Sequence, residues 1–369
     1  MDVFRFVSLP CEYEIGLGIP VKGKLLKQPT IPPRIEAAKD VRSLTESMRY
    51  IGFQGRMLAA VVDVWAKMLK REYNVIFLGL AGAMVPAGMR RMISHLIKRR
   101  MIDVLVSTGA NLYHDTFEAL GGHHYMGSAH ANDVQLRRNR IDRIYDVFAD
   151  EDKFYKLDLT IQKKFAQMLI DNYPYSSREI LIELGKMLSE KAREKDSIVL
   201  SAYDTGVPIF CPAIGDSSLG FSIMFANRAG RSIRVDGLKD VHESSLITQR
   251  APRTGVIYIG GGVPKNFIQQ TAVVASYQTR HDKSHDSAIQ ITTDMPMWGG
   301  LSGCTFEEAQ SWGKIGPRAK MAVCYCDATI ALPIVANALN QRFPKIRRNI
   351  PEFTWKDSGL ELNFHMEKL

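Results

Sequence analysis

NVIFLGLAGA at Asn74–Ala83 and MIDVLV at Met101–Val106 are the two stretches of sequence that decide the fold. Each contains a compact apolar run, which is typical of a strand buried on both faces of a parallel sheet. The residues between them, from about Pro86 to Arg99, have the apolar spacing of a helix. The order strand, helix, strand predicts two parallel strands joined by a crossover helix.

The same alternation continues on both sides of this unit. Apolar positions between Val41 and Tyr73 recur at helical spacing and predict two helices. A middle region from about Leu136 to Lys195 is predicted to be helical. Further strands are expected at Ser197–Leu200, Val207–Cys211, Val256–Ile259, Ala288–Thr292 and Ala322–Cys326. The predicted fold class is α/β: a Rossmann-like, mostly parallel sheet with helices on both faces, which binds ligands at the carboxyl ends of its strands.

The pattern divides the chain into three parts. Residues 1–34 are rich in proline and glycine and predict an irregular N-terminal arm. Residues 35–346 carry the alternating strands and helices without a repeat or a low-complexity tract, so we expect a single Rossmann-like domain. Residues 347–369 are expected to form a C-terminal surface tail.

Composition indicates a cytoplasmic protein. The chain has 369 residues, of which 46% are hydrophobic, and can bury a substantial core. It has no apolar run near the roughly 20 residues of a membrane-spanning helix, and Met1–Pro10 lacks the pattern of a signal peptide. Five scattered cysteines do not form a disulfide framework and fit a reducing compartment.

The net charge of +9 raises the question of a nucleic-acid partner. The basic residues lie mostly in amphipathic helices, as in RRMISHLIKRR at Arg90–Arg100, and solvated helix faces are the better interpretation. We therefore expect no nucleic acid and no membrane as partners. A cationic substrate would need acidic side chains gathered locally at its site.

The first candidate site is the turn Gly260–Gly262, which follows a predicted strand and precedes a helix that begins near Pro264. Exposed backbone amides and a helix N-terminus at such a turn can receive a pyrophosphate. The turn is not a complete GxGxxG, and a simple tight strand-to-helix turn remains an alternative. Ser107–Ala110 has the same placement after a strand, so the two turns together indicate a nucleotide crevice.

The second candidate lies between Ser302 and Lys314. Glu308 and Trp312 are four residues apart and share one face of a predicted helix. An indole ring beside a carboxylate suits an alkylammonium ion, because the ring attracts the cation and packs against its methylene groups. Lys314 can act as a nucleophile if its neutral amine is available. The alternative is a surface helix that ends in Gly313 and a solvated lysine.

Other polar groups have ordinary explanations. Asp216 and Asp327 follow predicted strands and are read either as helix N-caps or, for Asp327, as an acid that contacts a ribose. Two sets of side chains are potential metal ligands, namely His123, His124 and His130, and Cys324 with Cys326. Neither set offers a convincing complete coordination shell, and no metal is predicted.

SWGKI at Ser311–Ile315 resembles the deoxyhypusine synthase family at its catalytic lysine. The resemblance extends from about Gln28 to Phe343 and includes LAGAMVPAGMR at Leu80–Arg90, IDVLVSTGA at Ile102–Ala110, VPIFCPAIGDSSLG at Val207–Gly220, GGGVPKN at Gly260–Asn266 and CDA at Cys326–Ala328. It implies an NAD-binding, Rossmann-like enzyme that is usually a homotetramer with active sites shared between subunits.

The resemblance also implies roles for individual residues. The positions that would contact NAD are Thr108, Asp216, Gly261, Thr293, Ser302, Asp327 and Ala328. The positions around the amine substrate are Asn266, Leu301, Glu308 and Trp312, and Lys314 would form the covalent imine. In the implied reaction, NAD takes a hydride from spermidine, the aminobutyl group passes through Lys314 to a second amine, and the stored hydride is returned.

Three positions depart from the family pattern. Asn266 stands where deoxyhypusine synthases carry a histidine, and Phe221 and Leu301 stand where they carry aspartates. LRRNRIDRIYDVF at Leu136–Phe148 replaces an asparagine-rich segment. This pattern resembles the bacterial branch, whose members act as homospermidine synthases.

The departures leave three functions to compare. We expect transfer from spermidine to a small diamine such as putrescine. The first alternative is a deoxyhypusine synthase that modifies a lysine of a translation initiation factor precursor. The second is a catalytically silent NAD-binding protein, although Glu308, Trp312 and Lys314 are all retained.

Overall fold

A six-stranded parallel sheet organises the chain, which the computed structural model describes over residues 28–356 and 359–368. The strand order is β11-β10-β9-β1-β2-β7. The strands are β1 (Asn74–Leu80), β2 (Val104–Ser107), β7 (Ile209–Phe210), β9 (Arg253–Ile259), β10 (His285–Thr292) and β11 (Ile315–Tyr325). The α/β class and the parallel sheet predicted from the sequence are confirmed.

The strand order reverses beside β1. The chain runs outward from β1 through β2 to β7 and then returns to pair β9 with the other side of β1. Leu80 lies opposite Ser107 on one side and Ile259 on the other, so three strands end at the same level. In open parallel sheets this reversal creates a crevice at the carboxyl ends of the strands.

Alternate residues of β1 build two separate cores. Ile76, Leu78 and Leu80 pack in a cluster with α3 (Phe53–Lys70), α4 (Arg90–Lys98) and α14 (Ala328–Arg342). Val75 and Phe77 point to the other face, where they meet α11 (Gly237–Arg250) and α12 (Gly262–Thr279). The two-residue period of a strand therefore buries both faces of the sheet. The two helices predicted before β1 are α2 (Val41–Met48) and α3.

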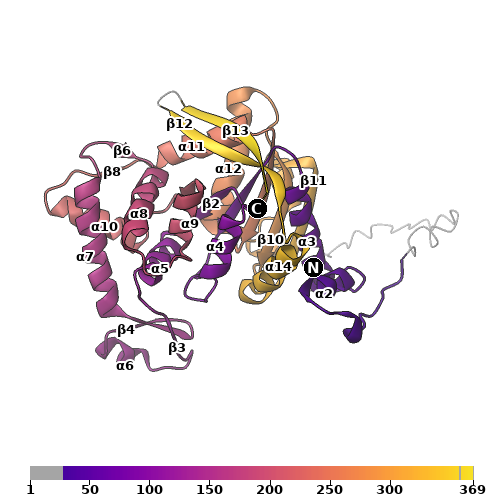
Figure 1. Cartoon of the computed structure of the whole chain (residues 1–369), viewed down its shortest axis with the longest axis horizontal. Helices are drawn as coiled ribbons and strands as arrows, with labels where there is room; N and C mark the ends of the chain where they lie inside the picture. The colour runs from indigo at the N-terminus through magenta and orange to yellow at the C-terminus, as the bar shows by residue number, and fades with distance from the viewer. Residues whose placement is uncertain (1–27, 357–358, 369) are drawn as a thin grey trace, which may run out of the picture.

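A lobe of helices gathers on one side of the sheet, at the left of Figure 1. It contains α5 (Gly109–Ala119), α7 (Glu151–Met168), α8 (Ser177–Lys191), α9 (Ile198–Thr205) and α10 (Ser218–Arg228). Two short strands, β6 (Pro174–Tyr175) and β8 (Arg234–Val235), pair within it. No helix in the described ranges is both long and apolar enough to cross a membrane.

The strand predicted at Ser197–Leu200 was wrong, because these residues begin α9. The Ser197 hydroxyl accepts a hydrogen bond from the Leu200 amide at 3.1 Å. The buried carboxylate of Asp115 accepts bonds from the Ile198 and Val199 amides at 2.7 and 2.9 Å. These acceptors satisfy the free amides of the first helical turn and override the strand preference of two β-branched residues.

The middle region predicted to be helical also contains a small sheet. A short helix, α6 (Asp133–Arg138), is followed by the hairpin of β4 (Ile141–Ile144) and β5 (Val147–Asp150), which pairs further with β3 (Tyr125–Met126). Arg140 and Tyr145 have positive φ angles of 56° and 55°. Single left-handed residues of this kind reverse the chain without any glycine in the sequence to signal a turn.

Residues 347–369 were expected to form a surface tail, but 347–368 include an ordered hairpin of β12 (Arg347–Lys356) and β13 (Gly359–Lys368). Arg348 is 3% exposed and donates to Asp103 Oδ2 at 2.8 Å, to the Asn74 carbonyl at 2.7 Å and to the Arg100 carbonyl at 2.7 Å. The hairpin is thereby joined to the starts of β1 and β2. Residues 1–27 of the predicted N-terminal arm lie outside the described part, and η1 (Ile35–Ala37) follows it.

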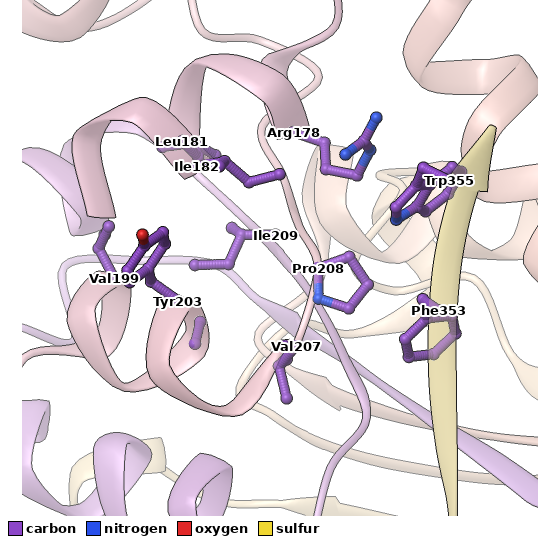
Figure 2. A pocket seen from close by; sticks show the side chains of 12 residues that line it. Arg178, Leu181, Ile182, Val199, Tyr203, Val207, Pro208, Ile209, Phe353 and Trp355 are labelled. Atoms are coloured by element: carbon purple, nitrogen blue, oxygen red, sulfur yellow. The ribbon is translucent and has the colours of Figure 1, made fainter. Parts of the chain in front are cut away.

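An apolar cavity of about 210 Å³ lies between α8, α9, the start of β7 and β12. Phe353 and Trp355 on β12 face Val207 and Pro208 across it (Figure 2). The Arg178 guanidinium stacks 4.1 Å from the Trp355 ring and pairs with Glu243 at 2.8 Å. This cavity lies at the amino end of β7. The predicted ligand-binding turns follow the carboxyl ends of the strands, so the cavity and the turns lie at opposite ends of the parallel strands.

We predict that Arg348→Ala lowers the free energy of unfolding by about 3–5 kcal/mol, because it removes a buried ion-pair partner of the Asp103 carboxylate and the side-chain donor to two backbone carbonyls. Urea unfolding followed by circular dichroism measures the change. Lys356→Ala is the matched control, since its partner Glu361 lies on the exposed face of the same hairpin. Equal stability of the two variants would contradict the role of Arg348.

Candidate active site

The predicted cofactor turns meet at one edge of the sheet. The Ala81 amide donates to the Ile259 carbonyl at 3.0 Å, and the Gly260 amide donates to the Ile291 carbonyl at 2.9 Å. The Cys326 amide bonds to the Thr292 carbonyl at 3.1 Å. The ends of β1, β9, β10 and β11 therefore lie side by side. Thr108, Gly261, Thr293, Asp327 and Ala328 all follow strands that end there.

Gly261 forms the floor of a narrow cradle at the start of α12. A side chain at this position would collide with the backbone of Ser302, and the Ser302 hydroxyl accepts a hydrogen bond from the Gly262 amide at 2.9 Å. Gly260 and Gly262 have φ angles of 71° and 54°, which favour glycine. The three glycines thus let the loop that carries Ser302 lie directly on the turn.

Lys265 fixes this loop, and the sequence analysis missed it. Its side chain is 1% exposed, and its Nζ donates to Cys304 O at 2.6 Å, Gln290 Oε1 at 2.9 Å and Ser302 O at 3.1 Å. Burial lowers the pKa of Lys265 to about 8. The sequence signal for Lys265 is its place in the GGGVPKN motif, four residues after Gly261, which is the N-cap of α12.

Lys314 lies beside the start of α12. Its Nζ donates to Asn266 Oδ1 at 3.2 Å and sits 5.4 Å from the centre of the Trp312 ring. Glu308 lies on α13 (Phe306–Ser311), whose first turn is capped by Thr305. Lys314 is half-buried, while Trp312 is 66% exposed. The structure therefore brings Lys314, Asn266 and Trp312 together next to the glycine turn.

The remaining predicted residues at this edge are less enclosed. Thr108 caps α5 by accepting from the Asn111 amide, and Asp327 caps α14 by accepting from the Thr329 amide. The cap predicted for Asp327 agrees with the structure. Thr293 and Leu301 are exposed, and Ala328 is half-buried. Leu301 follows η2 (Pro296–Trp298), in the loop that leads to Ser302.

Asp216 belongs to a second cavity, of about 600 Å³. It does not cap α10, whose N-cap is Ser217. Gly109 packs so closely on Ser217 that any added side chain would collide with it, which places Asp216 near the Thr108 turn. The described residues around this cavity do not include Lys314, so the predicted site residues form two groups rather than one.

Carboxylates and aromatic rings surround this second cavity. The lining includes the acids Asp142, Glu151, Asp158 and Asp216 and the rings of Tyr113, Phe154, Tyr155 and Phe221. Burial raises the pKa values of Asp142 and Asp158 above their ordinary values. Asp142 comes from β4, in the segment that departs from the family pattern. The cavity therefore holds acids that the sequence analysis did not assign.

Within the histidine group, the contacts of His124 have a structural explanation. His124 Nδ1 lies 2.7 Å from Glu118 Oε1, and His124 Nε2 lies 2.9 Å from His114 Nδ1. Burial lowers the pKa of His114 to about 4, so its ring is neutral at pH 7. Across the described ranges, no three side chains of histidine, cysteine, aspartate or glutamate are grouped to hold a metal ion.

The Lys265 pKa predicts a pH dependence of stability. A folded pKa of about 8, below the ordinary value of 10.5, means that the unfolded chain binds the extra proton between these pH values. The free energy of unfolding should therefore rise from pH 8 to 10.5, by on the order of 2–3 kcal/mol. We expect Lys265→Met to remove this rise, measured as the difference between urea unfolding curves.

Lys345→Met, at an exposed lysine, serves as the control for the same titration. Its stability should follow that of the unsubstituted protein across the pH range. Parallel curves for the protein and its Lys265→Met variant would contradict the depressed pKa.

The chain is similar to known proteins over most of its length. A sequence model described as deoxyhypusine synthase matches residues 43–339. The chain is 52% identical over 337 residues to "Probable deoxyhypusine synthase 2" of Methanosarcina acetivorans, covering 91% of this chain and 97% of the relative. It is 40% identical over 301 residues to "Deoxyhypusine synthase-like protein" of Chlorobaculum parvum, covering 80% and 85%.

A solved structure agrees at the level of the fold. A crystal structure from Entamoeba histolytica, provisionally named a deoxyhypusine synthase, superposes with a TM-score of 0.59 at 16% identity and covers 84% of this chain and 96% of that one. With the family match over most of its length, the chain belongs to the deoxyhypusine synthase family of enzymes that transfer aminobutyl groups.

Proposed function

We propose that the enzyme is NAD-dependent, takes the aminobutyl group of spermidine onto Lys314 as an imine, and passes it to a small diamine such as putrescine. The observation that carries the proposal is the placement of Lys314. Its Nζ lies 3.2 Å from Asn266 Oδ1 and 5.4 Å from the Trp312 ring, beside the glycine turn. A lysine held by one acceptor and one ring can present its amine to a substrate carbon.

The crevice fits a dinucleotide. Gly260 and Gly262 give the turn after β9 its positive φ angles, and the N-terminus of α12 begins at this turn, where a pyrophosphate would bind. Thr108, Ser302, Thr293, Asp327 and Ala328 would hold the cofactor along the strand ends. When bound, NAD supplies the oxidation that makes the carbon–nitrogen bond of spermidine exchangeable and later returns the hydride.

The chain's own residues would perform the exchange. The Trp312 ring and the Glu308 carboxylate attract the substrate ammonium group. The Lys314 amine attacks the activated carbon and forms the lysine imine, and diaminopropane leaves with the proton that the lysine gives up. Asn266 Oδ1 accepts one N–H of Lys314 and orients the amine. A second amine then attacks the lysine imine and releases Lys314.

A small diamine as the acceptor is supported by the three positions that differ from the family pattern, Asn266, Phe221 and Leu301. Without a histidine and two aspartates at these positions, the ordinary amine contacts are missing. The acids of the second cavity, among them Asp142 and Asp158, offer other contacts for a short diammonium ion. Their aromatic neighbours, including Phe154 and Tyr155, can cover its methylene groups.

Assembly would join the two groups of residues. The lining of the second cavity contains Asp216 and Phe221 but not Lys314, so one copy supplies two separate parts. We infer a homotetramer in which the cavity of one subunit faces Lys314 of another. The exposed rings of Trp312 and Phe221, at 66% and 49%, support burial against a second copy.

The two alternatives predict different products. The named relatives favour deoxyhypusine synthesis on a protein lysine, and the missing acids favour a catalytically silent protein. Purified enzyme is incubated with NAD, labelled spermidine, and either putrescine or a translation initiation factor precursor. Label in homospermidine supports the proposal, label on the precursor supports the first alternative, and no release of diaminopropane supports the second.

We expect Lys314→Ala to abolish both the release of diaminopropane and the transfer of label, because it removes the amine that Asn266 and Trp312 contact. Borohydride trapping followed by mass spectrometry should show the aminobutyl adduct only on the unsubstituted protein. Lys314→Arg keeps the charge but cannot form the imine and should be equally inactive. Full activity of either variant would remove Lys314 from the mechanism.

Asp142→Asn should raise the KM for putrescine roughly fivefold, because a half-buried carboxylate contributes about 1 kcal/mol to binding a cation. The kcat should change less than twofold, since the substitution leaves the Lys314 group intact. Steady-state kinetics measure both constants. Asp133→Asn removes an equal charge at an exposed position outside the cavity and should leave the KM unchanged.

A further inference from the structure

A third cavity lies at the opposite edge of the sheet from the glycine turn. It has a volume of about 500 Å³, within the range of small-molecule sites. It opens where β9 and β10 begin and where β11 passes beside them. Its lining joins the end of α3 at Arg71, the start of β9 at Arg253, the loop Asp282–Ser284 and the first part of β11.

The cavity is strongly basic. Five cationic side chains line it, namely Arg71, Arg253, Lys283, Arg318 and Lys320, against the two carboxylates of Asp282 and Asp286. Both carboxylates already have partners within the fold. Asp286 accepts from Arg71 at 3.2 Å and from the Thr254 amide at 3.2 Å, and Asp282 accepts from the Ser284 amide at 2.8 Å.

Two of the cations have no partner in the part of the chain that the structure describes. Among the described residues, neither Arg318 nor Lys320 makes a hydrogen bond or an ion pair, and Arg253 reaches only the Glu72 carbonyl at 3.4 Å. Like charges that converge on a cavity repel each other unless an anion lies between them. The cavity therefore carries positive charge that the described residues around it do not neutralise.

An irregularity in β11 places these two cations at the cavity. His285 pairs with Ile315, but Ser287 pairs with Lys320, so the strand bulges through Gly316–Ala319. A bulge of this kind bends the strand and redirects its side chains. The same residues line the cavity, and they begin two positions after Lys314.

The geometry points to a binding site for a small, multiply charged phosphate compound in this cavity, separate from the amine and cofactor sites. Guanidinium groups bind phosphate oxygens through paired hydrogen bonds, and ammonium groups add charge. The amine substrates of this family are cations, so five positive side chains would repel rather than hold them. The hydroxyl of Ser284 offers a further donor.

The test uses inorganic tripolyphosphate as the probe and isothermal titration calorimetry on the full chain at constant ionic strength. We expect saturable binding of one tripolyphosphate per chain. The double variant Arg318→Gln with Lys320→Gln should weaken the affinity at least tenfold. Lys345→Gln with Arg347→Gln removes the same charge from exposed positions outside the cavity and should change the affinity less than twofold.

A charge-retaining variant and competition by nucleotides test whether the positive charge of this cavity binds the probe. The charge-retaining pair Arg318→Lys with Lys320→Arg should bind within about threefold of the unsubstituted protein, and its unfolding curve checks that it folds. Saturating NAD should leave the tripolyphosphate affinity unchanged. ATP carries a triphosphate group and should compete with tripolyphosphate for the cavity. Equal loss in both charge-removing variants, or displacement by NAD, would overturn the proposal.

Discussion

The parallel pairing of β1 with β9 is the constraint on which the rest of the structure depends. It places Leu80 opposite Ile259 and so brings the turns after two strands, separated by most of the domain in sequence, to one level. Gly260 lies against Ala81 there, and the start of α12 opens beside them. Asn266, Lys265 and the loop that carries Ser302 are positioned from this helix, and Lys314 reaches the same place from the start of β11.

Sequence reasoning worked where a residue's neighbours in the chain decide its conformation. The apolar runs of β1, β9 and β10 predicted buried strands, and the glycines at 260–262 predicted the turn. It failed where distant groups decide. Asp115 lies more than 80 residues before the amides of α9 that it caps, and no local pattern announces that contact. The positive φ angles at Arg140 and Tyr145 were equally hidden, because neither residue type marks a turn.

The candidate site shows the same division. Lys314, Trp312 and the glycine turn were found because their motifs are contiguous, and the structure brings Lys314 next to Asn266. Lys265 was missed because its importance comes from three acceptors contributed by β10 and by the loop after η2. The acids of the second cavity were missed because β4 and α7 converge only in the folded chain. Phe221, which stands where the family carries an aspartate, thus has acidic neighbours in the cavity that a motif comparison does not reveal.

The contact between Arg348 and Asp103 has a consequence for synthesis on the ribosome. The two residues are 245 positions apart, and Asp103 is fully buried at the start of β2. At typical elongation rates the ribosome needs on the order of 10 to 50 s to make the intervening chain. Until Arg348 is made, the Asp103 carboxylate has the Ile76 amide and the Arg100 guanidinium as its neighbours. The buried ion pair at the base of β1 and β2 is therefore completed only after the hairpin of β12 and β13 has been synthesised.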